Sequence, residues 1–552
     1  MRLALSLLLG LAMSAASPAA PFCVDEASLT DLRGALDAGK VTSSELVDAY
    51  AARIAALDKD GPRLNAVRAL NPDAASIAAA RDAARSSGHG NLSPLDGIPI
   101  LIKDNISTAD RQTTTAGSVA LSDAVAERDS FVAKRLRAVG AIILGKTNLT
   151  EFANFMAIDM PSGYSSLDGQ VLNPYGPSVK GDGRPLVDVG GSSSGSASAA
   201  AASLAAATIG TETSGSLLNP ASNNGLVTVK PTVGLISRAG IIPISASQDT
   251  AGPMTRSVRD AALLLGVLIG VDPDDSATSA SAGHFSTDYT KFLKPDALKG
   301  ARIGVPRDPA DKANDVFYGP LDDGQKAVMD GVIATLKSLG ATIVEATIPT
   351  AGVVDEGTGS SIDVANTNPL SETKGKAESV PTVLVYEFKH DLNQYLAHYM
   401  PHGKVKTLAD IIAVNQTLGD KALRFGQDIL QAAEATRGDL KEPAYRAARR
   451  LDLKNSRKDG IDFYLHRHKL DAILFPAYFG ADLAARAGYP SVSVPAGFLT
   501  KIKDETVPAF PFGATFTGPA FSEGKLLGLA YAFETATKSR TAPALGASCR
   551  PE

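Results

Sequence analysis

After its first 20 residues, the sequence has no apolar run long enough to cross a membrane as a helix. It also has no stripe of basic residues, since 54 Lys and Arg are outnumbered by 59 Asp and Glu, and the formal net charge is −5. These absences argue against a membrane-spanning protein and against a nucleic-acid partner. Nor does the sequence show an internal repeat or a long charged or proline-rich linker.

What the chain does have is the composition of a large folded protein. It contains 552 residues, of which 44% are hydrophobic and 20% are charged. This balance supports a sizeable core and excludes global disorder. Length alone would allow several domains.

Residues 1–20 have the pattern of a secretory signal peptide. Met1 and Arg2 give a positive start, Leu3 to Ala16 form an apolar stretch, and small residues follow up to Ala20. The alternative is a buried N-terminal helix. The signal peptide predicts a periplasmic or secreted protein with no membrane association after cleavage.

Cysteine is scarce. Cys23 follows the expected cleavage region and Cys549 lies close to the end of the chain. Disulfides persist in exported proteins, and chain termini often lie close together on a domain surface. We therefore predict a Cys23–Cys549 disulfide, with two unpaired cysteines as the alternative.

Histidine is absent from the three segments in which reactive side chains gather. The first is an apolar stretch that ends in Lys103, the second is the Gly/Ser-rich run 190–196, and the third is the Gly/Thr/Ser-rich run 210–216. His466 and His468 match neither a zinc-protease motif nor a Cys/His zinc site. No metal and no nucleotide cofactor is expected.

Lys103 can replace histidine as a base if it is uncharged. It follows five residues that are apolar or proline, which is typical of a buried strand. Burial disfavours the charged form of a lysine and lowers its pKa. A neutral lysine could then take a proton from a serine hydroxyl, which is a weak nucleophile without such help.

In their order and residues, these segments resemble the amidase signature family. The resemblance continues through 230–235, 247–253 and 487–495, and so covers most of the chain after the signal peptide. It implies one large α/β/α domain over residues 21–552, with a mixed, twisted central sheet covered by helices. It also implies an amide-bond hydrolase that works through an acyl-enzyme.

The resemblance assigns roles to individual residues. Lys103 would be the base, Ser192 the relay after a cis peptide bond, and Ser216 the nucleophile. The oxyanion hole would come from backbone N–H groups of Thr213, Ser214, Gly215 and Ser216. Two departures from the family stand beside these positions: Glu212 where Asp is frequent, and Ser214 where Gly is frequent.

Further segments resemble the peptide amidase branch, which removes the C-terminal amide of peptides. They are 152–155, 162–165, 173–175 and 384–389. The resemblance therefore implies a peptide or small-molecule amide as substrate. It leaves the preferred side chain and the oligomeric state open.

Several alternatives compete with this interpretation. Residues 191–195 satisfy G-x-S-x-G, so an α/β-hydrolase with Ser193 as nucleophile is one of them. A flexible linker in the Gly/Ser/Ala run is another. A component of a tRNA-dependent amidotransferase that carries the same triad and a non-catalytic binding protein are the remaining two.

The apolar periodicity predicts alternating helices and strands. Helices are expected after a capping box at 42–45 and over 73–85, 197–207, 325–339 and 523–534. Strands are expected at 98–102, 141–144, 186–189, 301–305 and 472–476. This alternation favours a sheet with helices on both faces.

Overall fold

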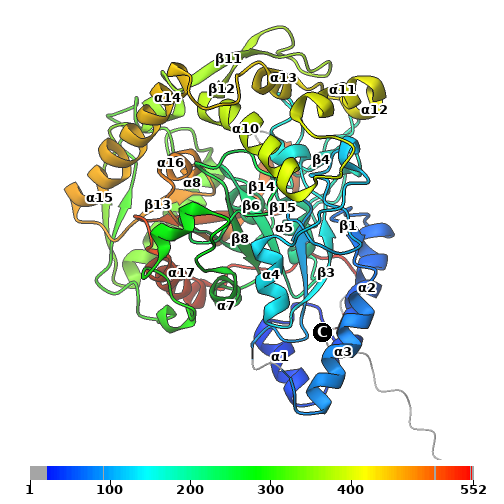
Figure 1. Cartoon of the computed structure of the whole chain (residues 1–552). Coiled ribbons are helices and arrows are strands. Elements are labelled where there is room, and N and C mark those ends of the chain that lie inside the picture. Colours follow the sequence, from blue (N-terminus) through cyan, green and yellow to red (C-terminus); the bar gives the residue numbers. More distant parts are fainter. Residues whose placement is uncertain (1–21, 91–92, 503–504, 547–548, 550–552) are drawn as a thin grey trace, which may run out of the picture.

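The computed structural model describes residues 22–90, 93–502, 505–546 and 549. The predicted signal peptide therefore lies outside the described residues. Figure 1 shows a central sheet wrapped by helices, as the resemblance implied for an α/β/α fold. The sheet has 11 strands and mixes parallel with antiparallel pairs.

The order of strands across this sheet brings distant segments together. In spatial order they are β1 (Val67–Leu70), β3 (Ile142–Thr147), β2 (Pro99–Lys103), β6 (Ala207–Glu212), β8 (Thr250–Thr255), β7 (Val227–Lys230), β14 (Ser491–Ile502), β15 (Glu505–Thr517), β13 (Ala472–Pro476), β9 (Arg302–Val305) and β10 (Thr342–Glu345). Since β2 and β6 are parallel neighbours, their carboxyl ends meet at one edge. The loops that follow these two strands are thereby placed next to each other.

Helices surround the sheet. They are α1 (Leu29–Asp37), α2 (Ser43–Ile54), α3 (Ala74–Ser86), α4 (Phe131–Ala138), α5 (Ser194–Ala201), α6 (Leu218–Asn223), α7 (Val258–Leu268), α8 (Asp323–Ser338), α9 (Ala351–Asp355), α10 (Thr382–Tyr399), α11 (Leu408–Leu418), α12 (Asp420–Leu423), α13 (Asp428–Glu434), α14 (Pro443–Leu453), α15 (Asp462–His468), α16 (Ala481–Ala487) and α17 (Glu523–Thr537). Two short hairpins, β4 (Tyr164–Ser165) with β5 (Gly169–Gln170) and β11 (Ser361–Ala365) with β12 (Ala377–Pro381), lie outside the main sheet.

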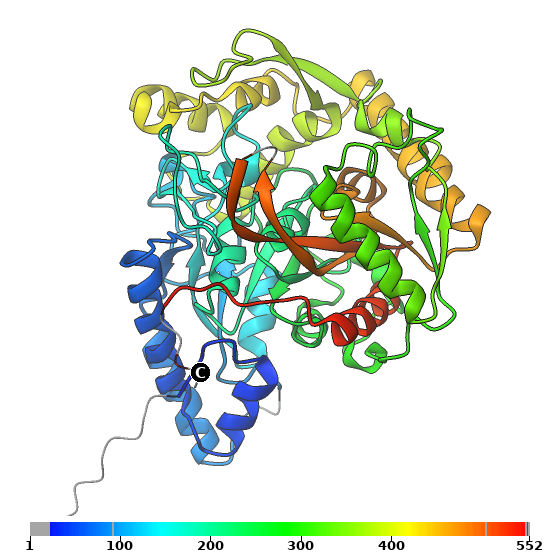
Figure 2. The ribbon, with the colours of Figure 1, turned by 180° about the vertical axis from the view of Figure 1, so that it is seen from behind.

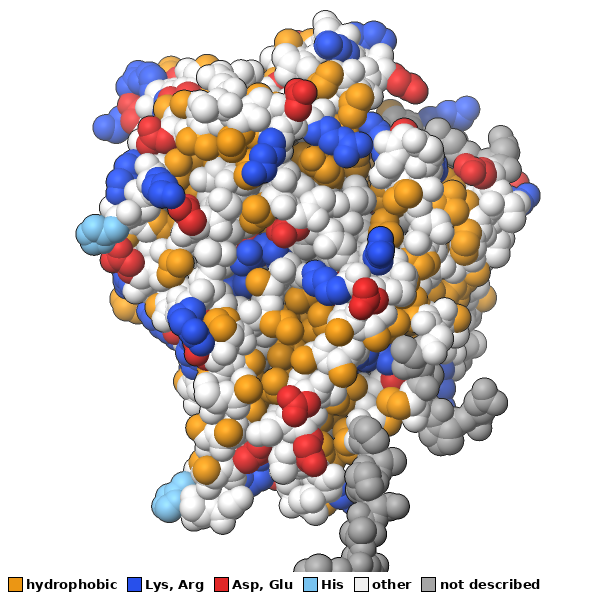
Figure 3. All heavy atoms as spheres, turned by 90° about the vertical axis from the view of Figure 1, so that its right-hand side faces the viewer, with side chains coloured by type: hydrophobic (Ala, Val, Ile, Leu, Met, Phe, Trp, Pro, Cys, Tyr) orange, Lys and Arg blue, Asp and Glu red, His pale blue; other side chains and the backbone are white. Residues whose placement is uncertain are grey.

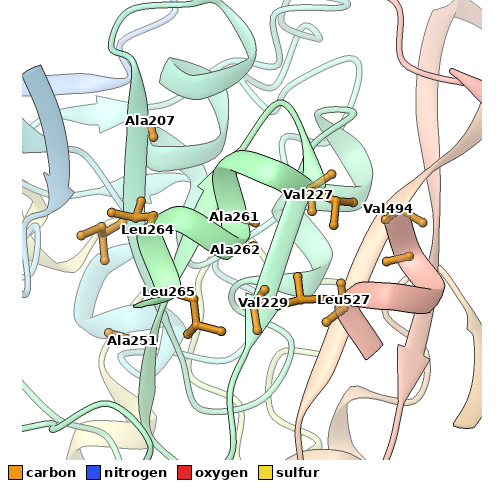
Figure 4. Close-up of a cluster of buried hydrophobic side chains, with 14 of the residues drawn as sticks. Ala207, Val227, Val229, Ala251, Ala261, Ala262, Leu264, Leu265, Val494 and Leu527 are labelled. Atoms are coloured by element: carbon orange, nitrogen blue, oxygen red, sulfur yellow. The ribbon is translucent and has the colours of Figure 1, made fainter. Parts of the chain in front are cut away.

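The main core lies between the sheet and helices α7 and α17. Figure 4 shows Leu264 and Leu265 of α7, with Leu527 of α17, against small and β-branched side chains of the sheet. Val227 and Val229 face this core, so Lys230 points to the opposite face of β7. A second apolar cluster fills the space between α5 and α6 on that opposite face. The helices therefore cover both faces, as predicted.

The two ends of the described chain are tied together. Cys23 and Cys549 form a disulfide with a Cα–Cα distance of 5.5 Å, so this prediction is confirmed. Nearby, Arg540 forms an ion pair with Glu26. Figure 2 shows the red C-terminal segment crossing to the blue N-terminal helices. The segment after α17 is thus linked covalently and by an ion pair to the segment that precedes α1.

A separate layer lies over the edge of the sheet that carries the reactive residues. Helices α10 to α14 and the β11–β12 hairpin form it, at the top of Figure 1. Its own apolar cluster includes Phe388, against whose ring the rings of Phe152 and Phe155 both pack. This layer joins loop 152–155 to α10 and supplies one wall of the candidate site.

Most predicted elements are found within a few residues of their expected bounds, and two predictions are wrong. Residues 186–189 form no strand, because Leu186 N–H donates to Ser178 in a local loop instead of a sheet. The alanine-rich helix ends at Ala201 and not near Ala207, since Ser203 has a positive φ of 54° and turns the chain into β6. The capping box at Thr42 is confirmed.

Charges are mixed over the surface. Figure 3 shows basic and acidic side chains interspersed on one face of the molecule. Within the described ranges, no helix combines the length and apolar character that a membrane span requires. Across those same ranges, no group of three or more His, Cys, Asp or Glu is placed to hold a metal ion.

Candidate active site

Lys103 is the last residue of β2 and has no exposed surface. Its burial lowers the pKa to about 7, although the nearby carboxylates of Asp249 and Glu212 act in the opposite direction. At neutral pH a large fraction of this amine is therefore uncharged. The sequence-based expectation of a buried lysine with a lowered pKa is confirmed.

The amine of Lys103 is surrounded by hydroxyl groups. Its Nζ lies 2.8 Å from Ser192 Oγ, 3.0 Å from Ser193 Oγ and 2.9 Å from Thr211 Oγ1. Asn105 Nδ2 also donates to Thr211 Oγ1, at 3.0 Å. A neutral amine in this position can accept a proton from one hydroxyl while it donates to others. Sequence reasoning assigned no role to Thr211, although it lies in the run 210–216, or to Asn105, which lies two residues after Lys103.

Ser192 and Ser193 come just before α5, and both are fully buried. The peptide bond between Gly191 and Ser192 is cis. Ser193 Oγ donates to the Thr211 carbonyl at 2.9 Å, so its partners are Thr211 and Lys103, not a histidine. This arrangement differs from the nucleophile elbow of an α/β-hydrolase.

Ser216 lies on the loop between β6 and α6, and it faces a cavity of about 390 Å³. Only 6% of its surface is exposed. The Ser193 backbone N–H donates to the Ser216 carbonyl at 3.2 Å, which joins the two serine-bearing loops. The structure thus brings together Lys103, Ser192 and the loop of Ser216, although they are far apart in sequence.

The loop that leads to Ser216 is fixed by side chains around it. Thr213 Oγ1 donates to Asp249 Oδ1 at 2.5 Å, and Ser214 Oγ donates to Asp482. Gly215 has a φ of +79°, a conformation that favours glycine. Thr213, Ser214 and Gly215 all line the cavity beside Ser216. The predicted oxyanion-hole residues are therefore located at the cavity.

Glu212 anchors the far side of this loop. Its Oε2 accepts hydrogen bonds from the backbone N–H groups of Leu217 at 2.7 Å and Leu218 at 3.0 Å. The N–H of Gly215 also interacts with this carboxylate. Burial raises the pKa of Glu212, and the neighbouring Lys230 ammonium counteracts that shift. The longer side chain of glutamate is thus accommodated as a cap for the start of α6.

The remaining walls of the cavity combine apolar and polar side chains. Asn154 and Phe155 come from the first segment assigned to the peptide amidase branch, and Leu384 comes from α10. The wall is completed by Ala153, Ser162, Gly191, Asn219, Ile244, Val316, Asp355, Tyr478, Phe479, Ala481 and Asp482. Sequence reasoning missed Tyr478, Phe479 and Asp482, because their loop after β13 carried no recognisable motif.

Residues 386–388 do not line the cavity, although their segment was assigned to the peptide amidase branch. Phe388 is buried in the apolar cluster of the layer formed by α10 to α14 and the β11–β12 hairpin. Glu387 accepts hydrogen bonds from Ser245, Ser247 and Tyr445. Of this segment, Leu384 alone is among the lining residues of the cavity.

Residues 140–147 carry a motif that the fold does not use. They read G-A-I-I-L-G-K-T, which satisfies the phosphate-binding pattern G-x-x-x-x-G-K-T. In the structure, Ile142–Thr147 is the buried strand β3 and not a loop before a helix. Lys146 Nζ donates to the Ile106 carbonyl and to Thr114 Oγ1. This segment therefore forms no phosphate cradle.

Comparison with known proteins adds to this geometry. Residues 45–527 match the model of the amidase family. A relative from Arabidopsis thaliana, named "probable amidase", is 38% identical over 531 residues, covering 95% of this chain and 92% of its own length. The glutamyl-tRNA(Gln) amidotransferase of Thermoanaerobacter pseudethanolicus contains a chain that is 31% identical, covering 94% of this chain and 97% of its own length.

Among solved structures, the peptide amidase of Stenotrophomonas maltophilia resembles this chain throughout. The two are 41% identical, and the TM-score is 0.81. The match covers 94% of this chain and 99% of the other. The likeness thus extends over nearly the whole of both chains.

Proposed function

The chain belongs to the amidase family and is an amide hydrolase, and on that premise we propose that it removes the C-terminal carboxamide of peptides. The observation that carries the chemistry is the contact of a fully buried lysine amine with Ser192, below a cavity lined by Ser216. The likeness to a peptide amidase over nearly the whole chain supports the choice of substrate.

In the proposed mechanism, neutral Lys103 acts as the base. It takes the proton of Ser192, and Ser192 takes that of Ser216 as the Ser216 oxygen attacks the amide carbonyl. The N–H groups of Thr213 and Ser214 would stabilise the resulting oxyanion. Gly215 N–H would contribute less, because it also interacts with Glu212.

The same groups would then work in reverse. The proton returns through Ser192 to the amide nitrogen, the C–N bond breaks, and ammonia leaves an acyl-enzyme on Ser216. Water attacks the ester carbonyl, with its proton passing to Lys103 by the same route. As the tetrahedral intermediate collapses, that proton returns from Lys103 through Ser192 to the Ser216 oxygen, and release of the peptide acid restores neutral Lys103 and the Ser216 hydroxyl.

The test is incubation with an amidated peptide and analysis by mass spectrometry and ammonia assay. We expect one equivalent of ammonia and the free acid, with internal peptide bonds intact. The matched control is the same peptide as its free acid, which should release no ammonia. If simple aliphatic or aryl amides react and peptide amides do not, the substrate proposal is wrong and the family assignment stands.

The amidotransferase relatives raise a second candidate, transfer of ammonia within a tRNA-dependent complex. The hydrolase is favoured because the peptide amidase shares 41% identity with this chain, against 31% for the amidotransferase chain. Ammonia release by the purified chain, without tRNA or another protein, would support hydrolysis. Activity only in the presence of both would support transfer.

We also propose that the protein is exported. The signal-like residues 1–20 motivate this, and the Cys23–Cys549 disulfide suits an oxidising compartment. The test is cell fractionation followed by N-terminal sequencing. A processed protein in the periplasm or medium is expected, and an unprocessed protein in the cytoplasm would contradict export.

A further inference from the structure

A second and larger cavity adjoins the one that contains Ser216. Its volume is about 690 Å³, and it lies between the loop after β9 and helix α8. It is lined by Arg307, Pro309, Lys312, Asp315, Val316, Tyr318, Gly319, Pro320, Leu321, Lys326, Met329, Asp330 and Asp355. Apolar side chains contribute much of this wall, and none of the proposed reacting groups is part of it.

The two cavities share part of their lining. Val316 and Asp355 border both the cavity of Ser216 and the larger one. The two cavities therefore meet at these two side chains. This junction connects the larger cavity with the proposed chemistry.

The wall of the larger cavity is held in place by polar contacts. Arg307 pairs with Asp330 at 2.9 Å and with Glu345 at 3.0 Å. Its guanidinium also lies over the Tyr318 ring, 5.8 Å from the centroid. Tyr318 donates its hydroxyl hydrogen to the Leu474 carbonyl of β13 at 3.0 Å. The cavity is thus braced against the central sheet, as a preformed binding site needs.

The apolar part of the wall favours a particular kind of occupant. Met329, Leu321 and Tyr318 are all buried, and all three line this cavity. The acidic and basic groups of the cavity balance in number, so its charge selects neither sign. An uncharged apolar side chain gains most from such a surface, because its burial removes apolar area from water.

We propose that the larger cavity binds the peptide portion on the amino-terminal side of the residue that carries the scissile carboxamide. It selects an apolar side chain there. This inference rests on the proposed function, because the leaving group of a carboxamide is ammonia and the peptide continues in one direction only. With the carbonyl carbon at Ser216, the junction at Val316 and Asp355 gives the rest of the chain a route.

The proposal predicts how activity depends on substrate length. We would measure kcat/KM for an amino-acid amide and for longer peptide amides that add either leucine or glycine toward the amino terminus. Extension with leucine should raise kcat/KM about tenfold over extension with glycine, the effect of apolar contacts in a pocket. Equal values for both series would overturn the proposal.

A pair of variants on α8 tests the location. Lys326 lines the cavity and Lys337 does not, and both are exposed residues of the same helix. Lys326→Trp should reduce kcat/KM for the leucine-extended amide about tenfold, by filling the cavity. The amino-acid amide should react as before. The matched control, Lys337→Trp, should leave both substrates unchanged.

Pro320→Trp repeats this test from the loop that precedes α8, where the residue is also exposed. Activity on the amino-acid amide reports that each variant is folded. Equal losses on short and long substrates, or no loss on either, would overturn the proposal. If the wild-type protein hydrolyses no peptide amide of any length but hydrolyses other amides, the proposed function itself fails.

Discussion

Two neighbouring strands each present a fully buried lysine, and the surroundings of the two differ. Lys103 is the last residue of β2, and its register partner on β3 is Thr147. Lys146 lies on β3 one residue before Thr147. Thr147 Oγ1 contacts Ser196 of α5, so Lys146 points to the opposite face of the sheet. Burial lowers the pKa of both lysines, to about 7 for Lys103 and about 8 for Lys146.

The partners of the two amines separate their roles. Lys103 contacts hydroxyl groups beside a cavity. Lys146 instead donates to a backbone carbonyl and to a threonine hydroxyl, both buried in the protein interior. The carboxylate of Asp104 opposes the effect of burial on the pKa of Lys146. Burial and a lowered pKa therefore do not by themselves mark a base. A base also needs a proton donor that leads to a substrate.

The largest effect is expected at the proposed nucleophile. Ser216→Ala should reduce kcat by about 10⁴–10⁶-fold, the usual cost of losing a nucleophile. Ser193→Ala should leave much of the activity, because Ser193 is buried and does not line the cavity. Steady-state kinetics on a peptide amide compares the two. A larger loss in Ser193→Ala would place the nucleophile there.

The next largest effect should separate the two lysines. Lys103→Ala should lose about 10²–10⁴-fold in kcat/KM, the contribution of a general base. Lys103→Arg should not restore activity, because arginine does not deprotonate in a protein. Lys146→Arg is the matched control and should retain far more activity. An active Lys103→Arg enzyme would refute the role of base.

The pH profile should reflect the neutral form of Lys103. Below its pKa of about 7, kcat/KM should fall about tenfold per pH unit as the amine becomes protonated. Titration of Asp249 could produce the same fall in activity, because burial raises the pKa of its carboxyl to about 7 as well.

The Asp249→Asn variant separates these two groups. The Asp249 carboxylate raises the pKa of Lys103, so its removal should shift the acid limb of the profile to lower pH. The limb itself should persist. If it disappears in this variant, Asp249 is the group that titrates.

The smallest effect on activity is expected on the other face of the sheet. Lys146→Met would leave the Ile106 carbonyl and the Thr114 hydroxyl without their donor. Loss of such buried hydrogen bonds should reduce the free energy of unfolding by about 1–3 kcal/mol. Denaturant unfolding measures this loss, with kcat/KM remaining close to wild type. A collapse of kcat/KM in a stable variant would contradict the distinction between the lysines.

Much of the fold and of the candidate site could be predicted from the sequence where the local signals were strong. Strand β2, its terminal lysine and the two serine-bearing runs are local in sequence, and so were recognised. Leu186 to Val189 show where such signals fail. Val187 and Val189 are buried by surrounding loops, and Leu186 N–H donates to the Ser178 carbonyl of such a loop and not to a strand.

Contacts between distant segments could not be read from the sequence. Thr211 and Asn105 lie in or beside the recognised segments, and Asp482 lies outside them. Their contacts at the site depend on the order of the strands and on the loop after β13. The residues 140–147 show the reverse case. Their letters fit a phosphate-binding loop, but strand pairing makes them part of the core.

One measurement tests the central claim most directly: the site and rate of covalent labelling by a fluorophosphonate. Its phosphorus is attacked by an activated serine, with loss of fluoride, and peptide mapping locates the adduct. We expect the adduct on Ser216, forming at similar rates in wild type and Lys146→Met, and at least about 10²-fold more slowly in Lys103→Met. An adduct on Ser193, or undiminished labelling in Lys103→Met, would contradict the assignment of Lys103 and Ser216.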